Sequence, residues 1–135
     1  MSEAVRVLVS GRGRGEALVL DEPLSFWGGV DPATGVVIDV HHPQAGSVVA
    51  GRILVMPAGR GSSSSSYVLA ESVRSGTAPA AIVLGEPDAI IALGALVATE
   101  LYGTSLPVVV APGAAFVTGD PVTVDTAAAP AIVRS

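Results

Sequence analysis

The sequence contains no cysteine and no lysine, and these two absences exclude several kinds of chemistry. Without cysteine the chain can form no disulfide, no thiolate zinc site and no thiol nucleophile, and it has no thiolate ligand for an iron–sulfur cluster. Without lysine it can form no Walker A loop, because that loop uses a lysine to contact phosphates. Any iron–sulfur cluster that serves this protein must therefore be held by a partner.

Charged and aromatic residues are scarce, at 14% and 4% of the chain. The seven basic residues are all arginine, and the formal net charge is -5. Binding to a nucleic-acid backbone or to an anionic membrane surface requires a basic face. We therefore expect neither nucleic acid nor a membrane as a partner, and we expect a core built from Val, Ile, Leu and Ala.

Long hydrophobic runs are also missing. The longest uncharged apolar run, residues 89–99, contains Gly94 and is far shorter than the roughly 20 residues that span a bilayer. The first 15 residues carry Glu3 and three arginines, and they lack the apolar stretch of a signal peptide. We therefore expect a soluble cytoplasmic protein. Its 135 residues, half of them apolar, predict a single domain over residues 1–135.

The first half of the chain predicts strands. Residues 5–9 and 17–20 are rich in β-formers, and the Gly11-Arg12-Gly13-Arg14-Gly15 segment between them is expected to be a connecting turn. A dinucleotide-binding loop is disfavoured there because the segment precedes a strand and not a helix. Residues 26–40 contain two further β-rich runs around a proline–glycine turn, which predict a hairpin.

The second half predicts a parallel βαβ core. Three short apolar strands are expected at residues 53–56, 80–84 and 107–110. A helix is expected between the first two, beginning in the serine run 62–66 and ending near Gly76. A second, largely buried helix is expected over Asp88–Tyr102, with Asp88 as its N-cap and Gly103 at its end. The fold class is therefore α/β with a β-rich first half.

Three side chains have two interpretations each. Adjacent histidines on a strand point to opposite faces, so His41 and His42 cannot easily chelate one metal ion. Each is expected to be a solvated loop residue, with an acid–base role as the alternative. The only tryptophan, Trp27, is expected to pack in the core, with a place in a pocket wall as the alternative.

The segment Gly59-Arg60-Gly61-Ser62-Ser63-Ser64, called the 59–64 loop below, is the candidate binding site. Its two glycines allow backbone N–H groups to approach a ligand, and the following helix contributes roughly half a positive charge at its N-terminus. Serine hydroxyls can hydrogen-bond a carboxylate or phosphate, and Arg60 can clamp one bidentately. The composition predicts an anion site, with the alternative that the glycines only form a turn and the serines only cap the helix.

Several motifs in the same order resemble the small subunit of aconitase X, from Gly11 to Val110. They are Phe26-Trp27-Gly28-Gly29-Val30-Asp31, Thr34-Gly35, His42-Pro43, Gly51-Arg52-Ile53-Leu54-Val55, Pro57-Ala58 with the 59–64 loop, and Ala78-Pro79-Ala80-Ala81-Ile82. The resemblance implies a single swivelling β/β/α domain with a barrel-like sheet. It is the counterpart of the mobile fourth domain of aconitase and of the isopropylmalate isomerase small subunit.

Those relatives carry Gly-x-Gly-Ser-Ser-Arg in the corresponding loop, with its first serine as the catalytic base. Carried over, this makes Ser62 the candidate base, and Ser64 stands where the pattern has arginine. The carboxylate clamp must then come from Arg60 or from the partner. The implied substrate-binding residues are Gly59, Arg60, Gly61, Ser63 and Ser64. Ser66, one turn further on, is expected to be dispensable.

The resemblance implies a carbon–oxygen lyase subunit that is inactive alone. In this family the iron–sulfur cluster belongs to a large subunit. The resemblance therefore implies that the present chain binds no cofactor itself. Bacterial members dehydrate cis-3-hydroxy-L-proline and archaeal members dehydrate phosphomevalonate. The Ala-, Gly-, Val- and Arg-rich composition without lysine is typical of a GC-rich bacterial source, which favours the proline derivative. The alternatives are a phosphomevalonate dehydratase small subunit and a non-catalytic carboxylate-binding module of the same fold.

Overall fold

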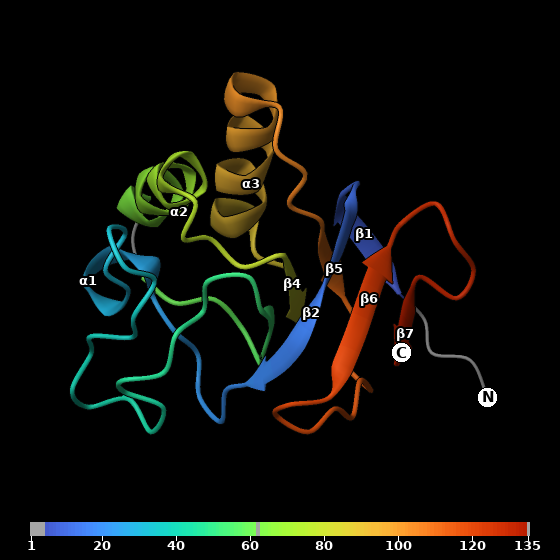
Figure 1. Ribbon diagram of the computed structural model, residues 1–135, viewed down its shortest axis with the longest axis horizontal. Helices are drawn as coiled ribbons and strands as arrows, with labels where there is room; N and C mark the ends of the chain where they lie inside the picture. Colours follow the sequence, from blue (N-terminus) through green and yellow to red (C-terminus); the bar gives the residue numbers. More distant parts are fainter. Residues whose placement is uncertain (1–4, 62, 135) are drawn as a thin grey trace.

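The computed structural model describes residues 5–61 and 63–134, which form one curled sheet with helices on one side (Figure 1). The strands are β1 (Arg6–Val9), β2 (Arg12–Val19), β3 (Ile53–Met56), β4 (Ala81–Leu84), β5 (Val108–Val110), β6 (Pro121–Asp125) and β7 (Ile132–Arg134). The helices are α1 (Phe26–Gly29), α2 (Ser64–Ser75) and α3 (Ala89–Tyr102). Within the described ranges, the sheet order is β1-β5-β4-β3-β2-β6-β7.

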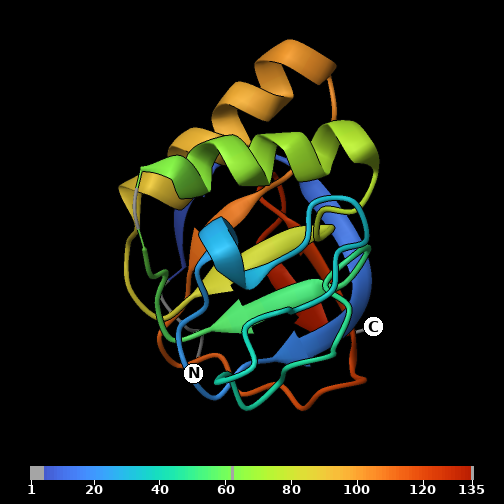
Figure 2. The ribbon, with the colours of Figure 1, turned by 90° about the vertical axis from the view of Figure 1, so that its left-hand side faces the viewer.

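The centre of the sheet is parallel and its edges are antiparallel. β2, β3, β4 and β5 pair in parallel, with Leu54 opposite Ile82 and Val83 opposite Val109. β1 pairs antiparallel with β5, and β6 pairs antiparallel with both β2 and β7. The predicted βαβ crossover and the α/β class with a barrel-like sheet are confirmed. In Figure 2, α2 crosses above the strands with α3 behind it.

The central strands supply side chains to two separate cores. Leu54 and Met56 of β3 face α2 and α3, where they pack with Leu69 among others. Ile53 and Val55 of the same strand face the opposite side and pack in a cluster that includes the β6 valines Val122 and Val124. Because successive side chains of a strand point to opposite faces, these short runs are apolar throughout.

The Gly11–Gly15 segment is not the connecting turn that its composition predicted. Residues 12–15 form the first half of β2 and pair with β6. A Cβ at Gly13 would overlap the backbone oxygen of Ala80, and one at Gly15 would overlap that of Gly51. Glycine is needed there because two other chain segments lie directly against the strand.

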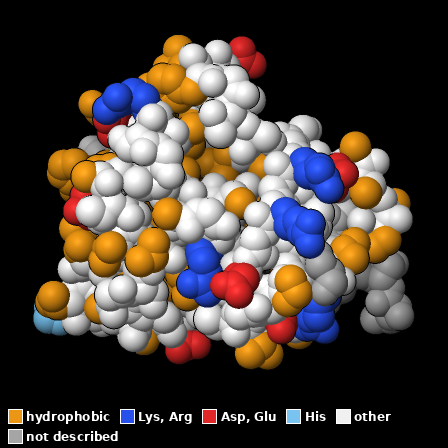
Figure 3. All heavy atoms as spheres, viewed as in Figure 1, with side chains coloured by type: hydrophobic (Ala, Val, Ile, Leu, Met, Phe, Trp, Pro, Cys, Tyr) orange, Lys and Arg blue, Asp and Glu red, His pale blue; other side chains and the backbone are white. Residues whose placement is uncertain are grey.

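The α3 helix begins and ends as predicted, but it is not largely buried. Asp88 accepts hydrogen bonds from the backbone of Ile90 and Ile91, and Gly103 closes the helix with φ of 66°. Only one face is buried, through Ile91, Gly94, Ala95 and Ala98. The opposite face exposes apolar side chains, and a groove of about 350 Å³ lies between it and α2. Figure 3 shows hydrophobic side chains gathered over these two helices.

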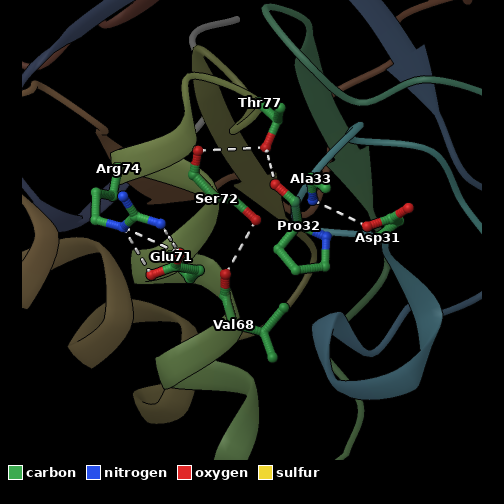
Figure 4. Close-up of polar contacts among 8 residues, drawn as sticks. All are labelled: Asp31, Pro32, Ala33, Val68, Glu71, Ser72, Arg74 and Thr77. Atoms are coloured by element: carbon green, nitrogen blue, oxygen red, sulfur yellow. Dashed lines mark hydrogen bonds and ion pairs between the residues drawn. The ribbon is translucent and has the colours of Figure 1, made fainter.

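The predicted hairpin over residues 26–40 is only partly present. Its turn forms at residues 31–35 with Gly35 at φ of 75°, and Val30 bridges Val37 antiparallel. The first run forms the short helix α1 in place of a strand. Thr77 joins this turn to the end of α2, since its hydroxyl donates to the Pro32 carbonyl over 2.6 Å (Figure 4).

No helix among the described residues is long and apolar enough to cross a membrane.

Candidate active site

The 59–64 loop lies at the carboxyl ends of the parallel strands, where α/β sheets bind their ligands. It follows β3 and leads into α2, and Gly59 forms a parallel bridge with Leu24. Ser62, the expected base, lies outside the described residues. The geometry of the site is therefore set out from the residues that surround it.

Polar side chains lie against both glycines of the loop. A Cβ at Gly59 would overlap the Asp88 carboxylate, and a Cβ at Gly61 would overlap the Ser25 hydroxyl. Gly61 also has φ of 110°, a backbone conformation that side-chain-bearing residues rarely adopt. The glycines thus do more than form a turn, since each allows a hydrogen-bonding side chain to approach the backbone.

The serines that begin α2 do not act simply as caps. Ser63 occupies the N-cap position, but its hydroxyl caps no backbone N–H of the helix among the described residues. Ser64 is exposed, whereas Ser65 is 3% exposed. Ser66 donates from Oγ to the Ile90 carbonyl over 2.7 Å, which joins α2 to the first turn of α3. Ser66 thus has a structural contact, and that it is dispensable for turnover stays a prediction.

Arg60 is exposed and makes no hydrogen bond or ion pair with the residues that the structure describes. The first turn of α2 carries no acidic side chain, so the partial positive charge of the helix N-terminus is not neutralised there. The nearby Asp88 carboxylate accepts the backbone N–H groups of Ile90 and Ile91 at 2.9 and 3.0 Å through Oδ1. The arrangement can attract an anion at the loop through Arg60 and the helix.

Two hydroxyl groups beside the loop were not found from the sequence. Ser25 precedes α1, and its Oγ lies 3.2 Å from Ser65 Oγ. Ser25 also donates to the Trp27 carbonyl, and the Trp27 N–H donates to Ser65 Oγ. Trp27 itself is 60% exposed, so its expected place in the core is wrong. No local pattern could have indicated the pair, because its members lie 40 residues apart.

The two histidines have different environments. His42 is 5% exposed, which differs from the solvated loop residue expected. Its Nδ1 accepts the Gln44 N–H over 3.0 Å, so Nε2 carries the proton and donates to the Glu22 carbonyl over 3.1 Å. Both ring nitrogens are thus engaged by backbone, as in a structural histidine. His41 is exposed.

The described part of the chain holds no group of three or more metal-ligating side chains, and the full sequence has no cysteine. This donor set does not fit an iron–sulfur cluster, which thiolates hold.

Comparison with known proteins identifies close similarity over nearly the whole chain. The family model of the aconitase X swivel domain matches residues 3–132. The cis-3-hydroxy-L-proline dehydratase of Pseudomonas aeruginosa is 56% identical over 103 residues, which cover 76% of this chain and 18% of that protein. The phosphomevalonate dehydratase small subunit of Methanothermobacter thermautotrophicus is 50% identical over 93 residues, covering 69% of this chain and 71% of that subunit.

A crystal structure of the holo form of Thermococcus kodakaraensis aconitase X has the same fold. It superposes with a TM-score of 0.85 at 38% identity and covers 98% of this chain and 95% of that chain. The chain spans less than a fifth of the length of the hydroxyproline dehydratases that it matches.

Proposed function

Because the chain belongs to the aconitase X swivel domain family, we propose that it is the small subunit of a dehydratase that acts on cis-3-hydroxy-L-proline. The observation that carries the choice of substrate is the 56% identity to the Pseudomonas enzyme, compared with 50% to the Methanothermobacter phosphomevalonate dehydratase subunit. The position of the 59–64 loop at the carboxyl ends of β3 and β4 supports a role for this loop in binding the substrate.

In the proposed reaction, Ser62 Oγ removes the proton from the carbon next to the substrate carboxylate. The electrons of that C–H bond form the carbon–carbon double bond, and the C–O bond to the hydroxyl group breaks, so that water is lost. A neutral serine is a weak base, and its alkoxide needs a positive environment. The N-terminus of α2 and the Arg60 guanidinium supply positive charge beside the loop.

We assign the substrate carboxylate to hydrogen bonds from the backbone N–H groups of Gly59 and Gly61 and from the backbone N–H groups and hydroxyls of Ser63 and Ser64. Arg60 is its counter-ion. The related loop has an arginine at the position of Ser64. In this chain Arg60 is assigned the role of that arginine. The exposed guanidinium has no competing partner among the described residues, which supports this assignment.

The chain has no residues that fit an iron–sulfur cluster, so the cluster and the departure of the hydroxyl are assigned to a large subunit. The proposal therefore requires a heteromer. The chain alone should not dehydrate either substrate, since it supplies a base and a carboxylate site without a group to assist the leaving hydroxyl.

The experiment is to purify the complex of this chain with its cysteine-bearing large subunit and to measure the loss of water from both substrates. Turnover of cis-3-hydroxy-L-proline by the complex, and not by the chain alone, is expected. Turnover of phosphomevalonate in its place would overturn the choice of substrate, and inactivity with both would favour a non-catalytic carboxylate-binding module.

The Ser62→Ala complex tests the base. It should lose turnover by about 10²- to 10⁴-fold, the usual contribution of a positioned general base. Ser75→Ala is the matched control because Ser75 is an exposed serine at the far end of α2. Normal turnover with a lowered melting temperature in Ser62→Ala would overturn the catalytic assignment and support a capping role.

A further inference from the structure

Two hydroxyl groups and one backbone unit form a closed ring of hydrogen bonds beside the 59–64 loop. Ser25 Oγ donates to the Trp27 carbonyl over 3.0 Å, and this bond uses its single proton. In the 3.2 Å contact between the two hydroxyls, Ser65 must then be the donor and Ser25 the acceptor. The Trp27 N–H closes the ring by donating to Ser65 Oγ over 3.3 Å. Every hydroxyl in the ring both donates and accepts.

This ring lies directly against the backbone of the loop. The Ser25 hydroxyl occupies the space that a Cβ of Gly61 would take, and Ser65 Oγ lies 3.2 Å from that position. Leu24, the residue before Ser25, forms a parallel bridge with Gly59. The segment before α1 therefore runs alongside the loop, and the ring fixes it to the first turn of α2.

We propose that Ser25 and Ser65 are positioning residues that hold the loop backbone at Gly61, the residue that precedes the proposed base, for the dehydration. The inference rests on the proposed function, since it gives Ser25 and Ser65 a role only if Ser62 is the base. Gly61 is directly bonded to the proposed base in the chain, which is why we assign the ring's effect on the reaction to the Gly61 backbone. Ser65 is 3% exposed, and its hydrogen bonds among the described residues run to Ser25 and Trp27 and not to the helix that carries it.

Removal of either hydroxyl opens the ring. In Ser65→Ala the Trp27 N–H and the Ser25 hydroxyl lose their partner, and in Ser25→Ala the Trp27 carbonyl loses its donor. A displacement of about 1 Å at a reacting group can cost on the order of 10²-fold in rate. Each variant complex is expected to lose about 10- to 100-fold in kcat, and Ser25→Ala/Ser65→Ala together should lose little more than either alone.

Ser72→Ala is the matched control. Ser72 lies on the same helix, is 1% exposed, and donates from Oγ to the Val68 carbonyl over 3.0 Å (Figure 4). Its removal deletes an equally buried hydroxyl and one hydrogen bond at a distance from the loop. Ser72→Ala should lower the melting temperature as Ser65→Ala does, while its complex keeps normal kcat.

The decisive measurement places each change in the Ser62→Ala background. If Ser65 acts only through the base, Ser62→Ala/Ser65→Ala should turn over no more slowly than Ser62→Ala. A further 10-fold loss there, or a normal kcat for Ser65→Ala and Ser25→Ala in an otherwise active complex, would overturn the positioning role and leave the proposed function intact. An inactive wild-type complex, or a fully active Ser62→Ala complex, would overturn the proposed function and the positioning role with it.

Discussion

Substitution of Asp88 by alanine tests how the loop and α3 are held together. Asp88 Oδ1 accepts two backbone N–H groups, from Ile90 and Ile91, and its carboxylate lies against Gly59. Loss of an aspartate N-cap costs about 1 kcal/mol, and hydrogen bonds to a charged acceptor raise the cost to about 2 kcal/mol. At about 2 cal/mol/K of unfolding entropy per residue, 135 residues give about 0.3 kcal/mol/K. The expected fall in melting temperature is therefore about 3–7 °C.

The assay is thermal unfolding of the isolated chain followed by far-ultraviolet circular dichroism. Asp88→Asn is the control, because asparagine caps a helix about as well as aspartate and keeps the acceptor oxygen. Its melting temperature should fall by no more than about 4 °C, since only the roughly 1 kcal/mol that the charge adds is lost. An unchanged melting temperature in Asp88→Ala, or an equal loss in Asp88→Asn, would refute the capping argument.

Two further changes probe the sheet and the surface of α2. Gly13→Ala should destabilise the chain by several kcal/mol or prevent folding, because the added Cβ overlaps the Ala80 backbone, whereas Arg14→Ala should change the unfolding midpoint in urea little. A folded Gly13→Ala chain of normal stability would contradict this contact. The Arg74 guanidinium, hydrogen-bonded to Glu71, lowers the pKa of that carboxyl below its usual value. This exposed pair stabilises the folded chain slightly at neutral pH, and the stabilisation is lost as the pH falls through the lowered pKa of Glu71. The melting temperatures of the wild type and Glu71→Gln should therefore converge on acidification. A difference in melting temperature that widens in acid would contradict this prediction.

The features that the sequence predicted correctly are those set by neighbouring residues. The apolar run Ile53–Met56 and the Asp88 cap each depend on contacts within a few positions, and both are present as expected. The segment between β3 and α2 is also the connection that its glycines and serines predicted. Local propensity and capping are sufficient for such elements because their stabilising groups lie close together in the chain.

The features that were missed depend on distant segments. The glycines at positions 13 and 15 indicated a turn, but they are required by the approach of Ala80 and Gly51. The partner of Ser65 is a serine 40 residues earlier, and no spacing rule connects them. The outer face of α3, including Leu93 and Leu101, was expected to be buried because an apolar helix usually is, yet the sheet covers only one side of it.

The division of each central strand between two cores has a consequence for how the chain unfolds. Leu54 and Val55 are neighbours in β3, yet they belong to hydrophobic clusters on opposite faces of the sheet. The cluster on the far face packs against the same strands that the helices cover. Loss of the helical layer would expose and destabilise these strands, so the two layers should unfold as one cooperative unit. Amide hydrogen exchange in β3 and β4 should then occur only through global unfolding, at one shared free energy. The loop follows β3, so it is attached to the region that we expect to exchange most slowly.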